Sequence, residues 1–256
     1  MGFYDLNKEQ RLQLADTINK DILFCLQQGK ESSMISYFSD EDTYIRKTAY
    51  LAIGKIWKQH PNLHISICSM LDKLFQSEQE KVRQTAVNAA GEIGMKEFEI
   101  VEHFFDSGLF DGHHIVRNAV IGSIKKMGDK NPEPVLKWAV KYLHHSDKEV
   151  RREICHGIEL RGRTYPQDIL PLLKELQYDK TARVRDTLVH VLGQIAYKKG
   201  CIGTVVQHLK SWDNKELVLR ALNEIVDVHD RYKDFSVLTQ QQAIDYIDRH
   251  YSGKTN

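Results

Sequence analysis

An aliphatic residue followed by arginine recurs along this chain at almost constant spacing. The copies are Ile45-Arg46, Val82-Arg83, Val116-Arg117, Val150-Arg151 and Val184-Arg185, with Leu217-Val218 as a degenerate sixth. The intervals between their first residues are 37, 34, 34, 34 and 33. A fixed period of about 20 to 50 residues is typical of chains built from one repeated supersecondary unit. The repeat therefore limits the fold more than any other feature of the sequence.

Each copy predicts one amphipathic helix. Apolar residues follow the first aliphatic residue at offsets of four, eight and eleven, as in Leu188, Leu192 and Ile195 of the fifth copy. Steps of four, four and three residues place side chains on one face of an α-helix. The fourth copy departs from the pattern, because Arg161 stands at the last of these offsets and Gly162 follows it.

Helical segments also separate the copies, for example PEPVLKWAVKYLHH and QDILPLLKELQYD, with turn-like residues such as Asn131-Pro132 between them. Such helical hairpins must stack on their neighbours, because none can bury its apolar face alone. The sequence thus predicts an all-α fold, a right-handed α-solenoid of about six hairpins. We expect one continuous domain with an N-terminal capping helix in residues 1–30, six repeats in 31–232, and a C-terminal capping helix and tail in 233–256.

Residues 31–230 resemble HEAT repeats, because several copies have Asp six residues before the Arg and Gly late in the helix. The Asp–Arg offset is met by Asp40 with Arg46, Asp111 with Arg117, and Asp179 with Arg185. The resemblance implies that Asp and Arg pair across successive repeats. The structural ladder would contain Arg46, Arg83, Arg117, Arg151 and Arg185 with these three aspartates. Since Ser77 and His145 replace Asp in two repeats, we expect Arg83 and Arg151 to need other partners.

Residues from Lys126 to about Val205 carry a narrower resemblance. The stretch VRREICHGIELRGRTYPQDILPLLKELQYDKTARVRD is similar to the repeats of the bacterial HEAT-like alkylpurine DNA glycosylases, a DNA alkylation repair family. That resemblance implies DNA held on a concave face, with an acidic residue beside aromatic residues acting on the damaged nucleotide. Glu153 and Glu159 are the candidate catalytic acids, although no Trp-Asp cluster stands beside them. Relatives with the same scaffold and no excision activity are also implied.

Charge is distributed unevenly along the chain. Residues 125–210 carry 17 Lys and Arg against 10 Asp and Glu, a net charge of +7, whereas the flanking segments carry −4 and −2. A basic block suits a phosphate backbone. The candidate nucleic-acid-binding residues are Lys125, Lys126, Arg152, Arg161, Arg163, Lys180, Arg183, Lys198 and Lys199. Arg161 has two interpretations: a cation at a helix C-terminus followed by Gly162 as the C′ residue, or part of an anion site at the ridge between repeats.

Other chemistries find little support in the sequence. The four cysteines have no C-x-x-C spacing, which predicts free thiols. The pairs His113-His114 and His144-His145 read as surface turn residues, and we expect no metal and no cofactor. No apolar run approaches the roughly 18 residues that a membrane span needs, and the N-terminus has no secretory signal pattern. We therefore expect a cytoplasmic protein that does not enter membranes.

These observations favour a macromolecule-binding scaffold that is not an enzyme, with protein or DNA on its concave face. The alternative is a DNA-binding protein of the alkylation-repair type; if catalytic, it would be a glycosylase acting on alkylated purines. A third possibility is a protein–protein adaptor that uses the acidic N-terminal repeats. The sequence leaves the partner, the oligomeric state and the pathway open.

Overall fold

The computed structural model describes residues 2–251, and within that range all regular secondary structure is helical. This confirms the all-α prediction. Residues 252–256 of the expected C-terminal tail, and Met1, lie outside the described residues. Across residues 2–251, no helix combines the length and the apolar character needed to cross a bilayer.

The helices form the six predicted hairpins between two terminal helices. The first and last are α1 (Lys8–Gln28) and α15 (Gln240–His250). Short 3-10 turns precede α1 (η1, Phe3–Asp5) and α4 (η2, Pro61–Leu63). The hairpins are α2 (Ser32–Ser39) with α3 (Thr43–Gln59), α4 (His64–Phe75) with α5 (Glu80–Gly94), α6 (Phe98–Gly108) with α7 (His114–Lys130), α8 (Pro132–Leu143) with α9 (Lys148–Gly157) and α10 (Glu159–Gly162), α11 (Pro166–Glu175) with α12 (Ala182–Ala196), and α13 (Cys201–Leu209) with α14 (Lys215–Arg231).

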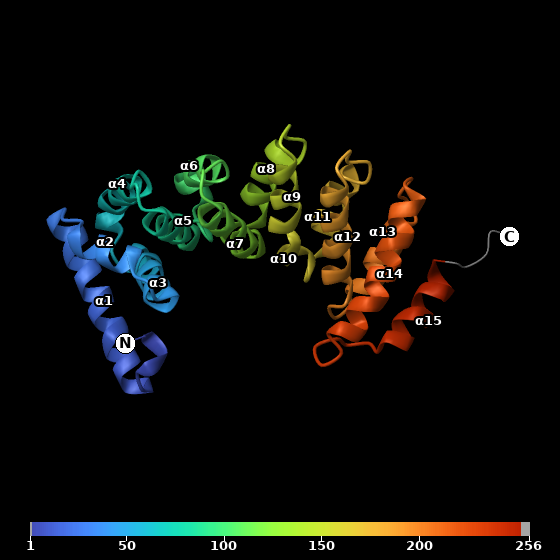
Figure 1. The fold of residues 1–256 in the computed structure, drawn as a ribbon, viewed down its shortest axis with the longest axis horizontal. Helices are drawn as coiled ribbons and strands as arrows, with labels where there is room; N and C mark the ends of the chain where they lie inside the picture. The colour runs from blue at the N-terminus through green and yellow to red at the C-terminus, as the bar shows by residue number, and fades with distance from the viewer. Residues whose placement is uncertain (1, 252–256) are drawn as a thin grey trace. The chain divides into compact units, whose positions relative to one another are not determined.

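The chain divides into two compact units, Met1–Asn131 and Pro132–Asn256. In the first unit, α5 packs against both α3 and α7; in the second, α12 packs against both α9 and α14 (Figure 1). We call these stacked helices, which carry the aliphatic–Arg pairs, the Val-Arg layer of each unit. The helices α2, α4, α6, α8 and α13 pack against this layer, whereas α11 packs mainly against α10 and α13. Whether the chain behaves as one continuous domain stays a prediction.

The repeating apolar positions form the core, as the helical spacing requires. Val184, Leu188, Leu192 and Ile195 of α12 are all fully buried. Close approach of neighbouring layer helices depends on a small residue at Gly91. A Cβ atom there would lie 2.5 Å from Oγ and 2.8 Å from Cβ of Ser123 on α7. Apolar burial and tight interhelical contact together therefore fix the stacking.

Candidate functional site

Arginines of the repeated pair bind the repeats together. Arg83 donates from Nε and Nη2 to the two carboxylate oxygens of Asp111, at 2.8 and 3.0 Å. Arg151 makes the same fork with Asp179, at 2.5 and 3.0 Å, and the two side chains are only 6% and 5% exposed. A planar guanidinium suits this two-bond geometry. In both pairs the aspartate belongs to the repeat that follows.

A second contact is common to all five arginines of the pair. Each donates from Nη1 to the backbone carbonyl six residues earlier, which satisfies the turn that leads into its helix. The acceptors are the carbonyls of Asp40, Ser77, Asp111, His145 and Asp179. The arginine thus fixes its own turn and, where an aspartate follows in the next repeat, the next turn as well.

The direction of pairing corrects one sequence-based expectation. Arg83 and Arg151 were expected to need other partners, yet these are the two that hold Asp111 and Asp179. The expectation was wrong because it compared each arginine with the acid of its own repeat. Each arginine reaches forward by 28 residues in these two pairs. Ser77 and His145 therefore stand where Arg46 and Arg117 would otherwise find an aspartate in the next repeat.

Arg161 does not point into the apolar face of its repeat, because its helix is interrupted. The single residue Ile158, with φ −84° and ψ −5°, separates α9 from α10. Gly162 then takes the buried place: a Cβ atom there would lie 2.4 Å from Cδ1 of Ile169 and 2.8 Å from Cδ1 of Ile195. Among residues 2–251, the glycines with positive φ are Gly29 and Gly200, so interpreting Gly162 as a left-handed C′ residue was wrong.

The guanidinium of Arg161 is instead occupied inside the corner between α10 and α11. Its Nε lies 2.7 Å and its Nη2 2.6 Å from one carboxylate oxygen of Asp168, in the first turn of α11. Its Cζ stacks over the Tyr165 ring, 3.8 Å from the centroid. The side chain is only 14% exposed. Arg161 thus holds a corner of the fold, and its charge is neutralised locally.

The nine candidate nucleic-acid-binding residues do not form one cluster. Lys125 and Lys126 lie on α7 of the first unit. In the second unit, the remaining seven divide between the two ends of α12, a helix of 15 residues that spans about 22 Å. Residues near its start are Arg152, Lys180 and Arg183, and those near its end are Arg161, Arg163, Lys198 and Lys199.

Most of these cations already have partners. Lys126 lies 3.3 Å from Glu92, Arg152 binds Glu149 at 2.8 Å, and Arg183 binds the same Glu149 at 3.3 Å. Lys198 lies over the Tyr197 ring. Lys180 and Lys199 are exposed, and within residues 2–251 neither forms an ion pair. Lys125 is half-exposed.

Polar contacts join equivalent residues of successive repeats along the Val-Arg layer of the second unit. We call them cross-repeat pairs: Glu149 with Arg183, Asp186 with Arg220, His156 with His190, and His190 with Glu224. Each joins two residues that are 34 positions, one repeat period, apart. Reading the sequence for apolar periodicity alone missed them. Polar residues recurring at the same period, such as the two histidines, were the signal that could have found them.

Glu159 is the most buried acid of this region, with 1% of its surface exposed. One carboxylate oxygen lies 3.1 Å from Nε2 of His156, and the other accepts a hydrogen bond from Nη2 of Arg163. The same Arg163 nitrogen donates to Oε1 of Gln194 at 2.9 Å. Glu153, the other candidate acid, is 5% exposed and lies 3.6 Å from Arg152. Both predicted acids therefore lie inside the helix layer beside arginines.

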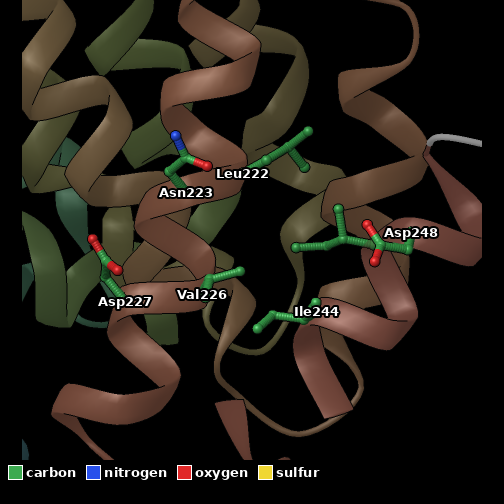
Figure 2. Close-up of a pocket in the computed structure, with 7 residues that line it drawn as sticks. Leu222, Asn223, Val226, Asp227, Ile244 and Asp248 are labelled. Atoms are coloured by element: carbon green, nitrogen blue, oxygen red, sulfur yellow. The ribbon is translucent and has the colours of Figure 1, made fainter. Parts of the chain in front are cut away.

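A groove of about 500 Å³ separates α14 from α15 (Figure 2). Its walls include the apolar residues Leu222, Val226 and Ile244. Asp227 of α14 and Asp248 of α15 lie on opposite sides of it (Figure 2). The sequence pattern did not reveal this groove, since it forms only where the terminal helix packs against the last repeat.

Comparison with known proteins rests on structure alone, because neither a protein-family model nor a curated protein matches the sequence. The solved structure of AlkD2 from Streptococcus mutans is similar, with a TM-score of 0.57 and 18% identity over 77% of this chain and 97% of AlkD2. A chain of the Pds5–Scc1 complex matches with a TM-score of 0.50 and 14% identity, over 95% of this chain and 41% of that one. The chain therefore has the HEAT/armadillo-like repeat fold.

Proposed function

We propose that this chain is a macromolecule-binding repeat scaffold without catalytic activity. The cross-repeat pairs carry the proposal, because they hold polar side chains in register over three successive helices. Arg183, Asp186 and His190 are 67%, 57% and 43% exposed, so the paired groups still reach solvent. Helices in contact lie about 8–10 Å apart. An extended polar surface of this spacing suits an extended partner better than a small molecule.

The surroundings of the two candidate acids argue against base excision. A catalytic carboxylate must reach the proton or atom on which it acts. Glu159 is buried and bonded to His156 and Arg163, and Glu153 is buried beside Arg152. Neither carboxylate is therefore exposed to a bound nucleotide as a catalytic acid must be.

DNA is the partner that the sequence and the fold favour, and it forms the second, more specific candidate. It is supported by the net charge of +7 in residues 125–210 and by the exposed Lys180 and Lys199, which form no ion pair within residues 2–251. The resemblance to the alkylpurine DNA glycosylases and the fold shared with AlkD2 point the same way. In this proposal, binding depends on phosphate contacts and is independent of base sequence.

The test of DNA binding is fluorescence anisotropy with labelled duplex DNA between about 50 and 200 mM salt. Affinity falls as salt rises, and each lost phosphate contact makes the slope of log affinity against log salt less steep by about 0.9. We expect K180Q/K199Q to make it less steep by up to about 1.8, because both lysines are exposed. The double variant K55Q/K58Q changes the charge equally at exposed residues of the first unit and should leave the slope unchanged. Arg161→Gln should also have little effect, because Asp168 already neutralises that charge.

A base-release assay separates a scaffold from an enzyme. Duplex DNA containing methylated purines is incubated with the full chain, and free base is measured by chromatography. We expect intact DNA. Release of a methylated purine that is lost in Glu159→Gln would refute the non-catalytic proposal. Absence of DNA binding even at the lowest salt would end the DNA candidate and leave a protein partner for the scaffold.

A further inference from the structure

Three potential metal ligands converge between the fourth and fifth repeats. They are His156 on the last turn of α9, Glu159 at the start of α10, and His190 on α12. One ligand atom from each lies within 4.8 Å of the other two. The two imidazoles are one repeat apart in sequence and come from adjacent helices.

The geometry is close to that of a tetrahedral zinc site. With metal–ligand bonds of about 2.0–2.2 Å, neighbouring ligand atoms in such a site are about 3.4 Å apart. Nε2 of His156 and Oε2 of Glu159 are 3.1 Å apart, so this edge is nearly at the required length. The ligand atom of His190 lies within 4.8 Å of both, so a side-chain movement of up to about 1.4 Å completes the triangle.

Neighbouring groups support the three ligands as outer-shell partners support known metal sites. Glu224 lies 3.6 Å from Nδ1 of His190 and is itself bound by Arg231 at 3.1 Å. Arg163 holds the Glu159 oxygen that does not face His156, which leaves Oε2 directed toward the imidazole. The histidine side chains are 34% and 43% exposed, which gives an ion access from solvent.

We propose that His156, Glu159 and His190 bind one divalent transition-metal ion, with zinc as the best fit. Two imidazoles and one carboxylate suit zinc and leave a fourth position open for water. Arg163 and Arg231 offset the negative charges of Glu159 and Glu224, and two of the three ligand atoms are nitrogens. Mg²⁺ and Ca²⁺ are disfavoured, because both prefer several oxygen ligands. The ion would connect α9 and α10 to α12. This inference does not depend on the proposed function, and it revises the sequence-based expectation of no metal.

Other histidine–carboxylate pairs of the chain provide a matched control. His144 lies 2.6 Å from Glu175 and is exposed, as is the pair of His103 with Asp72 at 2.8 Å. Neither pair belongs to a group of three potential ligands among residues 2–251. A substitution at His144 thus removes an imidazole beside a carboxylate without touching the cluster.

The experiment is calorimetric titration of the full chain, freed of metal by chelation, with Zn²⁺ and with Mg²⁺. We expect one Zn²⁺ per chain, no Mg²⁺ binding, and an affinity reduced at least about tenfold in His156→Gln and in His190→Gln. His144→Gln should bind as the unaltered chain does. Far-UV circular dichroism verifies that each variant is folded.

Cobalt substitution gives a second readout that does not depend on affinity. The absorption of bound Co²⁺ should indicate tetrahedral nitrogen and oxygen ligation and should change in His190→Gln but not in His144→Gln. Thermal unfolding should also shift upward with Zn²⁺ in the unaltered chain and not in His190→Gln, because binding only the folded state stabilises it. Absence of Zn²⁺ binding, or equal binding in the unaltered chain, His156→Gln and His190→Gln, would overturn the proposal.

Discussion

Replacing Arg151 with Met should destabilise the second unit strongly. Met keeps an unbranched apolar side chain but removes the guanidinium that binds both oxygens of Asp179. It also removes the donor to the His145 and Ser146 carbonyls. The Asp179 side chain is 5% exposed, so water cannot replace the lost bonds. A buried charge without its partner is the expected cause of the loss.

The magnitude follows from the burial of the pair. Removing one partner of a buried ion pair costs about 3–5 kcal/mol. The Arg183–Glu149 pair is 67% and 34% exposed, and pairs of that kind contribute about 0–1 kcal/mol. Arg183→Met is therefore the matched control. The double variant R151M/D179N should be more stable than R151M alone, because it removes the unpaired charge.

The pH dependence gives the prediction a second signature. Burial acts to raise the pKa of Asp179, but the hydrogen bonds from Arg151 and from the Thr181 amide outweigh it and hold the pKa below 3.8. A carboxyl with a lowered pKa stabilises the folded state above its unfolded value, and this contribution is lost as the pH falls through the folded value. The difference between the unaltered chain and R151M should therefore shrink as the pH falls below about 4.

Urea denaturation followed by tryptophan fluorescence and circular dichroism measures these free energies. Trp138 and Trp212 are both buried in the second unit and report on it. A loss below about 1 kcal/mol in R151M, equal to that in Arg183→Met, would refute the reasoning.

Three further predictions concern packing, thiol reactivity and pH. Gly91→Ala should cost about 1–3 kcal/mol in urea denaturation because its Cβ overlaps the neighbouring helix, whereas Gly112→Ala, whose Cβ meets nothing within 4 Å, should cost far less. Burial raises the pKa of the Cys155 thiol, so a thiol reagent should modify it only as the chain unfolds; modification in native buffer at the rate of a free thiol would contradict this. Burial lowers the pKa of His208 and of His229 below 6.5, so the second unit should lose stability as the pH falls through 6.5, measured as the urea midpoint; a constant midpoint from pH 7.5 to 5.5 would exclude it.

The sequence predicted the fold because a repeat fold depends on local contacts. Aliphatic residues at offsets of four, eight and eleven define a helix face wherever they occur, and the 34-residue period sets how often that face returns. The hairpins of residues 31–232 and both terminal helices follow from these patterns. Stacking of neighbours then follows, since each hairpin has only an adjacent one to cover its apolar side.

Individual side chains were harder to place, because their partners lie on other helices. In the sequence, Arg161 breaks the row of apolar residues. In the structure, the helix is interrupted at Ile158, so that Gly162 occupies the buried position instead. No periodicity rule anticipates a one-residue break in register. Seven of the nine candidate cations likewise divide between the two ends of α12, because closeness in sequence does not determine which end of a helix a turn adjoins.

By itself, the sequence determined that this chain is a row of helical hairpins with a basic segment in its second half. Only the tertiary structure decided that Arg151 reaches forward to Asp179 and that His156, Glu159 and His190 meet. The physical reason is the distance along the chain over which each kind of interaction acts. Helix formation and burial are settled within a few turns of the chain, whereas charge pairing and ligand geometry depend on distances between helices that apolar packing fixes first.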